Sequence, residues 1–216
     1  MIRLSVILAV TAIAACRGER PPTLPPTAAE LALGRELGLA DSAVALIKRA
    51  SGVELAPLRE VDSLGDPGAI RGFAFAVDPG QRGHAVAALR QQLGPKFTVF
   101  RTYDGFDRHP DSVGIVSTTD PAEIVRIRGT SGGNYDIDND SVVVLVSDWS
   151  RRLGFRIQGA GDDWVEGALP TDHVNFDSLA VTLNAVCPDV VTQGTGSVED
   201  LARELQSSHM LYCWWD

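Results

Sequence analysis

The sequence lacks an excess of basic residues. Lysine and arginine together number 19 against 28 aspartates and glutamates, which gives a formal net charge of −9. Nucleic acids and anionic lipid surfaces need a basic face on their partner, so we expect no nucleic-acid partner. The hydrophobic content of 44% still supplies enough apolar side chains for a core, which excludes wholesale disorder.

Also missing is an apolar run long enough to span a membrane. A transmembrane helix needs about 20 apolar residues, whereas residues 1–15 carry Arg3, a short apolar run and small residues before Cys16. This layout is typical of a secretory signal peptide. The aliphatic residue and two alanines before Cys16 resemble a bacterial lipobox, so we expect export and lipid anchoring through Cys16, on the periplasmic or surface face. The alternative is an ordinary signal peptide followed by a chance cysteine.

Cysteine and histidine are scarce, and neither shows metal-ligand spacing. There are three cysteines, four histidines and no C-x-x-C motif, so we expect no metal site and no cofactor. If Cys16 is lipidated, Cys187 and Cys213 remain. In an oxidising compartment a disulfide between them would stabilise the fold by about 3 kcal/mol. The alternative is two buried thiols that behave as small hydrophobic groups.

Composition along the chain predicts four parts. After the signal, four prolines favour an extended tether, and Asp41 or Ser42 is expected to cap a second helix after a break at Gly38. Residues 51–70, rich in Gly, Pro and Asp, are predicted to be loop. The parts are a signal peptide at 1–15, a Pro-rich tether at 16–27, a helical N-terminal extension at 28–70 and an α+β domain at 71–216.

Short apolar runs alternate with helical periodicity in the last part. Residues 141–153 are ambiguous, because their valines favour a strand, but the apolar spacing and the preceding aspartates favour a helix. The terminal run is apolar on both faces and is expected inside the sheet. Strands are predicted at 73–77, 97–101, 113–117, 155–160, 164–169 and 210–215, and helices at 81–93, from 121, at 141–153, at 176–186 and from 197. We therefore predict a two-layer α+β sandwich, with helices packed on a mixed β-sheet.

Four stretches resemble a bacterial family, the domain-of-unknown-function family 4253. They are RIRGTSGGNYDI at 126–137, DWVE at 163–166, CPDVVTQGTGSVEDLAREL at 187–205 and the ending LYCWWD. The resemblance is clearest from about residue 122 and extends back through the strand that contains Phe73. It implies no established activity, cofactor or catalytic residue, and it supports the helix at 141–153. The sequence departs from the family pattern at Gly133 and at Cys213.

Several motifs fail as chemical signatures. Asp136, Asp138 and Asp140 alternate as in a calcium loop, but the glycine and glutamate of an EF-hand are missing, so helix capping explains them better and a nonstandard calcium site is the alternative. Ser131 has no histidine partner in a supporting context. The Gly-rich stretch at 193–197 has no following lysine and fits a turn and cap rather than a phosphate loop.

The remaining polar residues suggest one shared site, and two functions compete for it. We predict this site in the polar motif loops, where function concentrates. Its residues would be Asn134, Tyr135, Asp136, Asp163, Glu166, Asp189 and Gln193.

The first function is a binding or interaction module displayed on the envelope, with the membrane and an envelope protein as partners. The alternative is a hydrolase that uses the carboxylates of Asp163 and Glu166 on an envelope substrate. Convergence of those two side chains and Asp136 in one pocket would favour the enzyme. Trp149, Trp164, Trp214 and Trp215, with Tyr135 and Tyr212, are candidates for lining a groove, although core packing accounts for most tryptophans.

Overall fold

The computed structural model describes residues 24–62, 65–105, 109–170 and 174–216. In chain order its elements are α1 (Ala28–Glu36), α2 (Asp41–Ser51), β1 (Ala56–Val61), β2 (Pro67–Val77), α3 (Pro79–Leu93), β3 (Thr98–Tyr103), β4 (Asp111–Val116), α4 (Pro121–Arg128), η1 (Gly133–Tyr135), α5 (Asn139–Leu153), β5 (Arg156–Ala160), β6 (Trp164–Ala168), α6 (Phe176–Val186), η2 (Val190–Thr195), α7 (Val198–Ser208) and β7 (Met210–Trp214). The expected signal peptide, Cys16 and most of the tether lie outside the described residues. None of the described helices is both long and apolar enough to cross a bilayer.

The described strands form one mixed sheet. Their order is β1-β2-β4-β3-β5-β6-β7. Neighbouring strands are antiparallel except β3 and β5, which run parallel where Arg101 lies opposite Gly159. The predicted α+β class, with helices packed on a mixed sheet, is confirmed.

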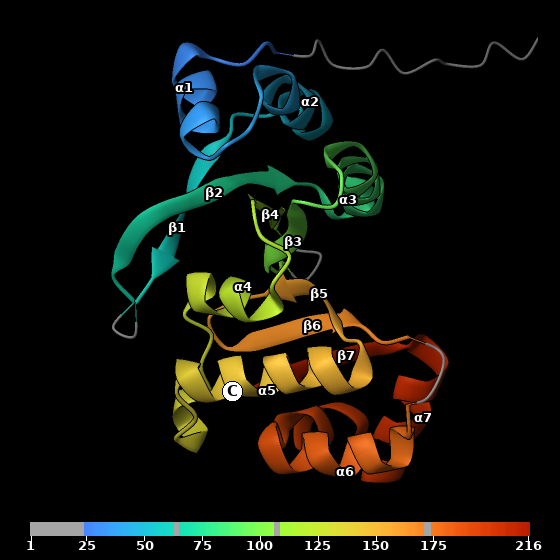
Figure 1. Cartoon of the computed structure of the whole chain (residues 1–216). Helices are drawn as coiled ribbons and strands as arrows, with labels where there is room; N and C mark the ends of the chain where they lie inside the picture. Colours follow the sequence, from blue (N-terminus) through green and yellow to red (C-terminus); the bar gives the residue numbers. More distant parts are fainter. Residues whose placement is uncertain (1–23, 63–64, 106–108, 171–173) are drawn as a thin grey trace, which may run out of the picture.

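Helices cover the sheet from both sides, and each side has its own core. In Figure 1, α1, α2 and α3 lie around the β1–β2 end, whereas α4 to α7 lie around β5, β6 and β7. Within β3, Val99 belongs to the core under α1–α3, and the next residue, Phe100, belongs to the core on the opposite face. The α1–α3 core contains no described residue of β5, β6 or β7. That face of the last three strands therefore lies outside the α1–α3 core.

The ambiguous segment at 141–153 is helical, as predicted. The side chain of Asp138 accepts a hydrogen bond from the Ser141 N–H at 2.8 Å and caps α5. Val142, Val146 and Trp149 are buried along one face of the helix. The 3.6-residue spacing of apolar groups outweighs the strand propensity of valine here, because it lets the whole face pack on the sheet.

The prediction that residues 51–70 form a loop is wrong. This stretch contains β1 and the beginning of β2, so the part expected to be a helical extension supplies β1 and the first residues of β2 to the common sheet. Proline is tolerated at Pro57 because β1 lies at the sheet edge. Gly72 is required by a close approach, since a Cβ there would lie 2.0 Å from the carbonyl oxygen of Ile115.

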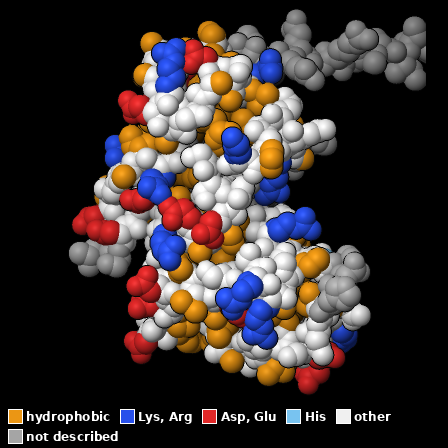
Figure 2. Space-filling view, in the orientation of Figure 1, with side chains coloured by type: hydrophobic (Ala, Val, Ile, Leu, Met, Phe, Trp, Pro, Cys, Tyr) orange, Lys and Arg blue, Asp and Glu red, His pale blue; other side chains and the backbone are white. Residues whose placement is uncertain are grey.

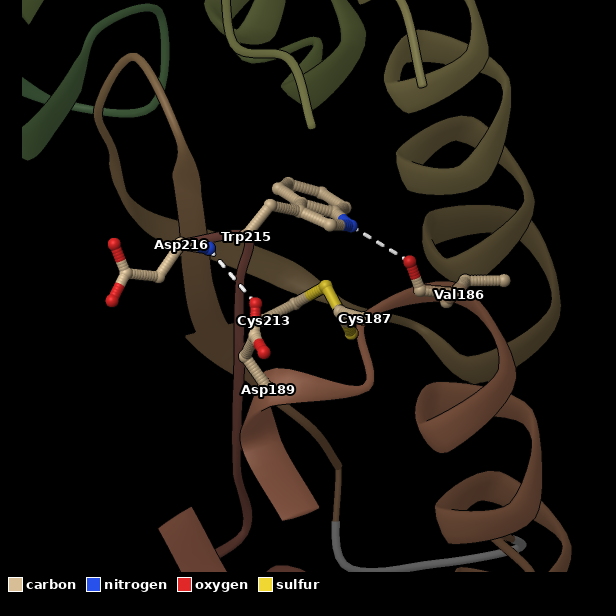
Figure 3. The surroundings of a disulfide bond; sticks show 6 residues. All are labelled: Val186, Cys187, Asp189, Cys213, Trp215 and Asp216. Atoms are coloured by element: carbon tan, nitrogen blue, oxygen red, sulfur yellow. Dashed lines mark hydrogen bonds between the residues drawn. A yellow bond between two sulfur atoms is a disulfide. The ribbon is translucent and has the colours of Figure 1, made fainter. Parts of the chain in front are cut away.

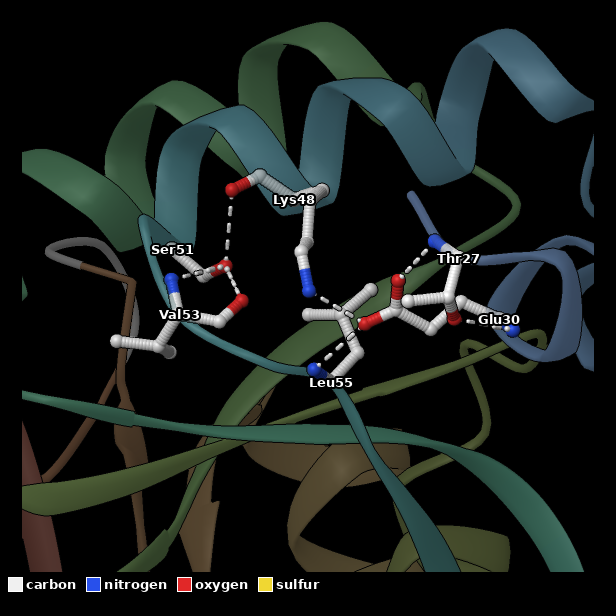
Figure 4. A network of polar contacts seen from close by, with 6 residues as sticks. All are labelled: Thr27, Glu30, Lys48, Ser51, Val53 and Leu55. Carbon is white, nitrogen blue, oxygen red and sulfur yellow. Dashed lines mark hydrogen bonds and ion pairs between the residues drawn. The ribbon is translucent and has the colours of Figure 1, made fainter. Parts of the chain in front are cut away.

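A buried ion pair joins the first two helices, and the capping predicted for α2 is absent. Ala40 precedes α2 without a side-chain cap, and Asp41 pairs instead with Arg35. Lys48 Nζ lies 2.6 Å from Glu30 Oε1, with both side chains almost fully buried. Glu30 also accepts from the N–H groups of Thr27 and Leu55 (Figure 4). These contacts fasten the start of α1 to α2 and to the chain entering β1.

The final strand lies at the edge of the sheet, which corrects the expectation that it would lie inside it. A disulfide joins Cys213 of β7 to Cys187 beyond α6, with the two Cα atoms 5.8 Å apart (Figure 3). The Trp215 indole N–H donates to the Val186 carbonyl at 2.7 Å. β7 is apolar on both faces because Leu211 and Cys213 point into the α4–α7 core while its alternate residues occupy the other face.

Candidate functional site

Three aromatic side chains form a row on the sheet face outside the α1–α3 core. The β6–β7 register pairs Trp164 with Trp214 and Glu166 with Tyr212, so all four side chains share one face. The rings of Trp164 and Tyr212 are stacked with centroids 5.8 Å apart. Those of Tyr212 and Trp214 are 5.2 Å apart and tilted by 47°. We call Trp164, Tyr212 and Trp214 the aromatic row.

Arg101 of β3 closes the inner end of the aromatic row. Its guanidinium lies 4.9 Å from the ring centroid of Trp164 and donates to Glu166 Oε2 at 2.5 Å and to Asp104. The Arg101 Nε is buried and has no hydrogen-bond partner among the described residues. A cation over an aromatic face is attracted by the ring quadrupole. This end of the row is therefore already occupied by a cation of the protein itself.

Two cavities flank the row and share Met210. The first, of about 290 Å³, is here called the polar cavity, and its lining is Val86, Ala87, Arg90, Arg101, Gln158, Glu166 and Met210. The second, of about 200 Å³, is here called the edge cavity, and its lining is Val190, Gly194, Thr195, Leu201, Glu204, Leu205, Met210, Tyr212 and Trp214. Because Met210 belongs to both linings, the two cavities adjoin, and we call them together the groove beside β7. Figure 1 shows β7 and α7, which supply walls of the edge cavity.

The wall of the edge cavity depends on a glycine. A Cβ at Gly194 would lie 2.9 Å from Cη2 of Trp214, so η2 approaches the indole as closely as its backbone allows. Short π-helical segments such as η2 often occur at functional sites.

Electrostatics keep the central phenol of the row protonated. Burial raises the pKa of Tyr212 to about 12; Arg101 opposes this shift, and the carboxylates of Asp104 and Glu166 add to it. Loss of solvation also lowers the pKa of Arg90, while Glu166 counteracts that change. At neutral pH the groove therefore presents a neutral hydroxyl on Tyr212.

Some of the predicted polar residues do come together, around Asp189. The Tyr135 hydroxyl donates to Asp189 Oδ1 at 2.7 Å, and the Asp216 N–H donates to Oδ2 at 2.8 Å. Burial raises the pKa of Asp189, but hydrogen bonds from Asp216, Tyr135, Thr192 and Gln193 outweigh it and leave the pKa lowered. Figure 3 shows this carboxylate beside the end of the last strand. The cluster ties η1 and η2 to the C-terminal residue, which is a structural role.

The other predicted residues do not join them. Asn134 and Asp136 are exposed beside Tyr135, and Asp136 adopts a left-handed conformation with φ of 55°. Asp163 is exposed, and its pKa is raised by partial burial and by Asp162. Glu166 lies in the polar cavity, whose lining includes neither Asp163 nor Asp136. The carboxylates expected of a hydrolase therefore do not converge in that cavity.

A larger cavity of about 500 Å³ lies elsewhere, between α1, β2 and α4. Two of its charged groups, Arg71 and Glu123, bind each other. Arg71 also pairs with Glu60 at 3.2 Å, and Arg126 lies 4.0 Å from Glu123. Figure 2 shows acidic and basic side chains mixed over this region. We favour the groove beside β7, because Tyr212 and Trp214 line its edge cavity, whereas the lining of the larger cavity contains no aromatic residue.

Sequence reasoning included Trp164, Tyr212 and Trp214 among groove candidates but missed Arg90, Arg101, Glu204 and Met210. An arginine inside an apolar strand at 98–103 was the available signal for Arg101, since a charged group there needs a partner. The contribution of α3 and α7 to the groove had no sequence signal, because it depends on how the sheet twists.

Comparison with known families concerns the C-terminal part of the chain. Residues 112–216 match the family model described as "Domain of unknown function (DUF4253)". This segment is similar to the DUF4253 family. The DUF4253 match covers just under half of the chain and contains the whole edge cavity. The resemblance expected from the sequence motifs is confirmed over this range, whereas the strand containing Phe73 lies before the match.

The DUF4253 segment supplies only part of the polar cavity. Arg90 and Arg101, on α3 and β3, precede the matched residues. Among the described residues, no group of three or more His, Cys, Asp or Glu side chains could hold a metal ion. No curated protein and no solved structure matches the chain.

Proposed function

We propose that this protein is a non-catalytic binding module whose ligand occupies the groove beside β7. The observation that carries the proposal is the pair of cavities, about 290 and 200 Å³, that share Met210 and adjoin the aromatic row. Ligand sites are typically concave and mostly apolar, with a few placed polar groups. The groove has this composition, with aromatic and aliphatic walls in one compartment and arginines in the other.

The arrangement of carboxylates favours binding over hydrolysis. A carboxylate pair that cuts a glycosidic bond faces one cleft across about 5 to 9 Å. Here Glu166 is held by Arg101, and Asp163 is absent from the lining of the polar cavity. The hydrolase alternative therefore has no supporting constellation in the groove.

We also propose that the module is displayed on the bacterial envelope by lipid on Cys16. The signal-like residues 1–15 and the following cysteine motivate this part, and the tether would hold the domain away from the membrane. Acyl labelling of wild type and Cys16→Ser tests it. We expect the label to disappear in the variant, and equal labelling would overturn the anchor.

The binding proposal is tested by screening the full chain against a library of small molecules and short peptides by ligand-observed NMR. Two substitutions then locate each hit. Ala87→Trp places a large side chain at an exposed position of the polar cavity. Thr182→Trp does the same in a separate cavity of about 290 Å³ between α5 and α6, and serves as the matched control.

We expect hits that Ala87→Trp weakens and Thr182→Trp leaves unchanged. A screen whose hits are indifferent to Ala87→Trp would count against the groove. Turnover of an envelope substrate that Glu166→Gln abolishes would replace the binding module by the hydrolase.

A further inference from the structure

The edge cavity has one charged group, and that group is acidic. Glu204 of α7 is the only charged residue in its lining. The Glu204 carboxylate has no ion-pair partner among the described residues, and the adjacent Arg203 is paired with Asp200. A charged group that enters this cavity would meet one charged side chain in its walls, and that side chain is negative. The lining therefore favours a cation.

The aromatic walls add to that preference. The ring planes of Tyr212 and Trp214 are inclined to each other by 47°, so the two rings form non-parallel walls of the cavity. Aromatic faces attract cations through the ring quadrupole, most strongly for Trp. The same row already holds the Arg101 guanidinium over Trp164 at its other end. At the outer end no lysine or arginine of the described chain lines the cavity.

The rest of the lining selects the kind of cation. Val190, Leu201 and Leu205 provide no hydrogen-bond acceptors in their side chains, and Met210 provides only a weak thioether acceptor. The Thr195 hydroxyl is engaged with the carbonyls of Val190 and Ser197. A bare ammonium or metal ion would lose most of its hydration there, whereas an alkylated ammonium carries apolar groups that gain from burial. The cavity of about 200 Å³ corresponds to roughly seven water-sized volumes of about 30 Å³ each. That is room for a trimethylammonium head.

We propose that the edge cavity binds the quaternary ammonium group of a soluble small molecule, between Tyr212, Trp214 and Glu204. This inference rests on the proposed binding function and specifies its ligand chemistry. Glu204 supplies the counter-charge at the exposed rim, and the two rings contact the alkyl groups. All three residues belong to the DUF4253 segment.

The test compares choline with 3,3-dimethylbutan-1-ol, which has the same shape but a carbon in place of the charged nitrogen. Binding of each to the full chain is measured by isothermal titration calorimetry and by NMR shifts of the Trp214 indole. We expect choline to bind about tenfold more tightly than the neutral compound, in line with a partly desolvated cation–π contact.

Variants assign the effect to the cavity. Glu204→Gln keeps the size of the side chain and should weaken choline severalfold while leaving the neutral compound unchanged. Glu199→Gln, exposed on the same helix and outside the lining, is the matched control and should change neither. Trp214→Leu should weaken choline further. If that variant fails to fold, Glu204→Gln alone still decides the matter.

Equal affinity for the two compounds, or no binding of choline, would overturn the inference. If choline does not bind, while other library compounds bind and lose affinity in Ala87→Trp, the proposed binding function is supported and only the assignment of a quaternary ammonium ligand is wrong. If no compound binds the groove, both proposals fall. Binding to phosphatidylcholine vesicles without binding to free choline would overturn the soluble ligand in favour of a lipid headgroup.

Discussion

Arg101 and Glu166 join two strands that are distant in the sequence and neighbours in the sheet. The guanidinium donates to the carboxylate at 2.5 Å, and both side chains are more than four-fifths buried. The contact spans the only parallel junction among the described strands, where the β1–β4 part of the sheet meets the β5–β7 part. The inner end of the groove is therefore built on an ion pair.

Replacement of Arg101 by methionine should destabilise the fold strongly. The change keeps an apolar stem but removes the cation that Glu166 and Asp104 share, and the loss of one partner from a buried pair costs about 3–5 kcal/mol. Urea unfolding measures the effect. Arg151→Met breaks an exposed pair with Asp148 and should cost less than about 1 kcal/mol. Similar losses in both variants would contradict the structural role of Arg101.

The buried pair of Glu30 and Lys48 should make the free energy of unfolding depend on pH in the acidic range. Burial would raise the pKa of Glu30, but hydrogen bonds from Lys48, Thr27 and Leu55 outweigh it and lower the pKa from 4.5 to about 2. The stabilisation is therefore complete above pH 4.5 and is lost as the pH falls from 4.5 towards 2. We expect the difference in unfolding free energy between wild type and Glu30→Gln to shrink across that window.

A pH series of urea unfolding measures this difference. Asp41→Asn, which removes the carboxylate of the exposed pair with Arg35, is the control and should cost little at any pH in the window. A difference between wild type and Glu30→Gln that stays constant from pH 7 to pH 2 would refute the assignment.

The disulfide should contribute to stability rather than to binding. The double variant Cys187→Ala, Cys213→Ala is expected to lose about 3 kcal/mol, because the covalent link constrains the unfolded chain. Thiol titration of the denatured, unreduced protein should find neither cysteine free. Reactive thiols at both positions in the purified, unreduced protein would contradict the bond.

Asp189 should stabilise the position of the chain end that follows the last strand. Its carboxylate accepts from Tyr135 and from the Asp216 N–H, and the loss of acceptors at a buried site costs about 1–3 kcal/mol. We expect Asp189→Asn to destabilise the protein and to speed amide hydrogen exchange at Asp216. Tyr135→Phe removes one donor and should cost about 1 kcal/mol. Unchanged stability with lost ligand binding would instead make Asp189 part of a binding site.

Much of the fold could be predicted because its signals are local. The helix at α5 has an aspartate cap and an apolar stripe, and α6 begins and ends where the pattern predicts. β1 was missed because edge strands admit the proline and bulges that sequence rules assign to loops. β7 was placed inside the sheet because an edge strand with core on one face and aromatic packing on the other shows the same pattern as a buried strand.

The candidate site, like the fold, could be predicted from the sequence only in part. By itself the sequence determined the acidic balance, the α+β class, the DUF4253 segment and the aromatic residues that now form the row, since each depends on composition or on neighbours along the chain. Only the tertiary structure decided that Arg101 closes that row, that Glu166 but not Asp163 lines the polar cavity, and that Glu204 and Trp214 line the same cavity. Those relations join β3, β6, η2, α7 and β7, and they arise from strand order and sheet twist, which leave no local pattern in the chain.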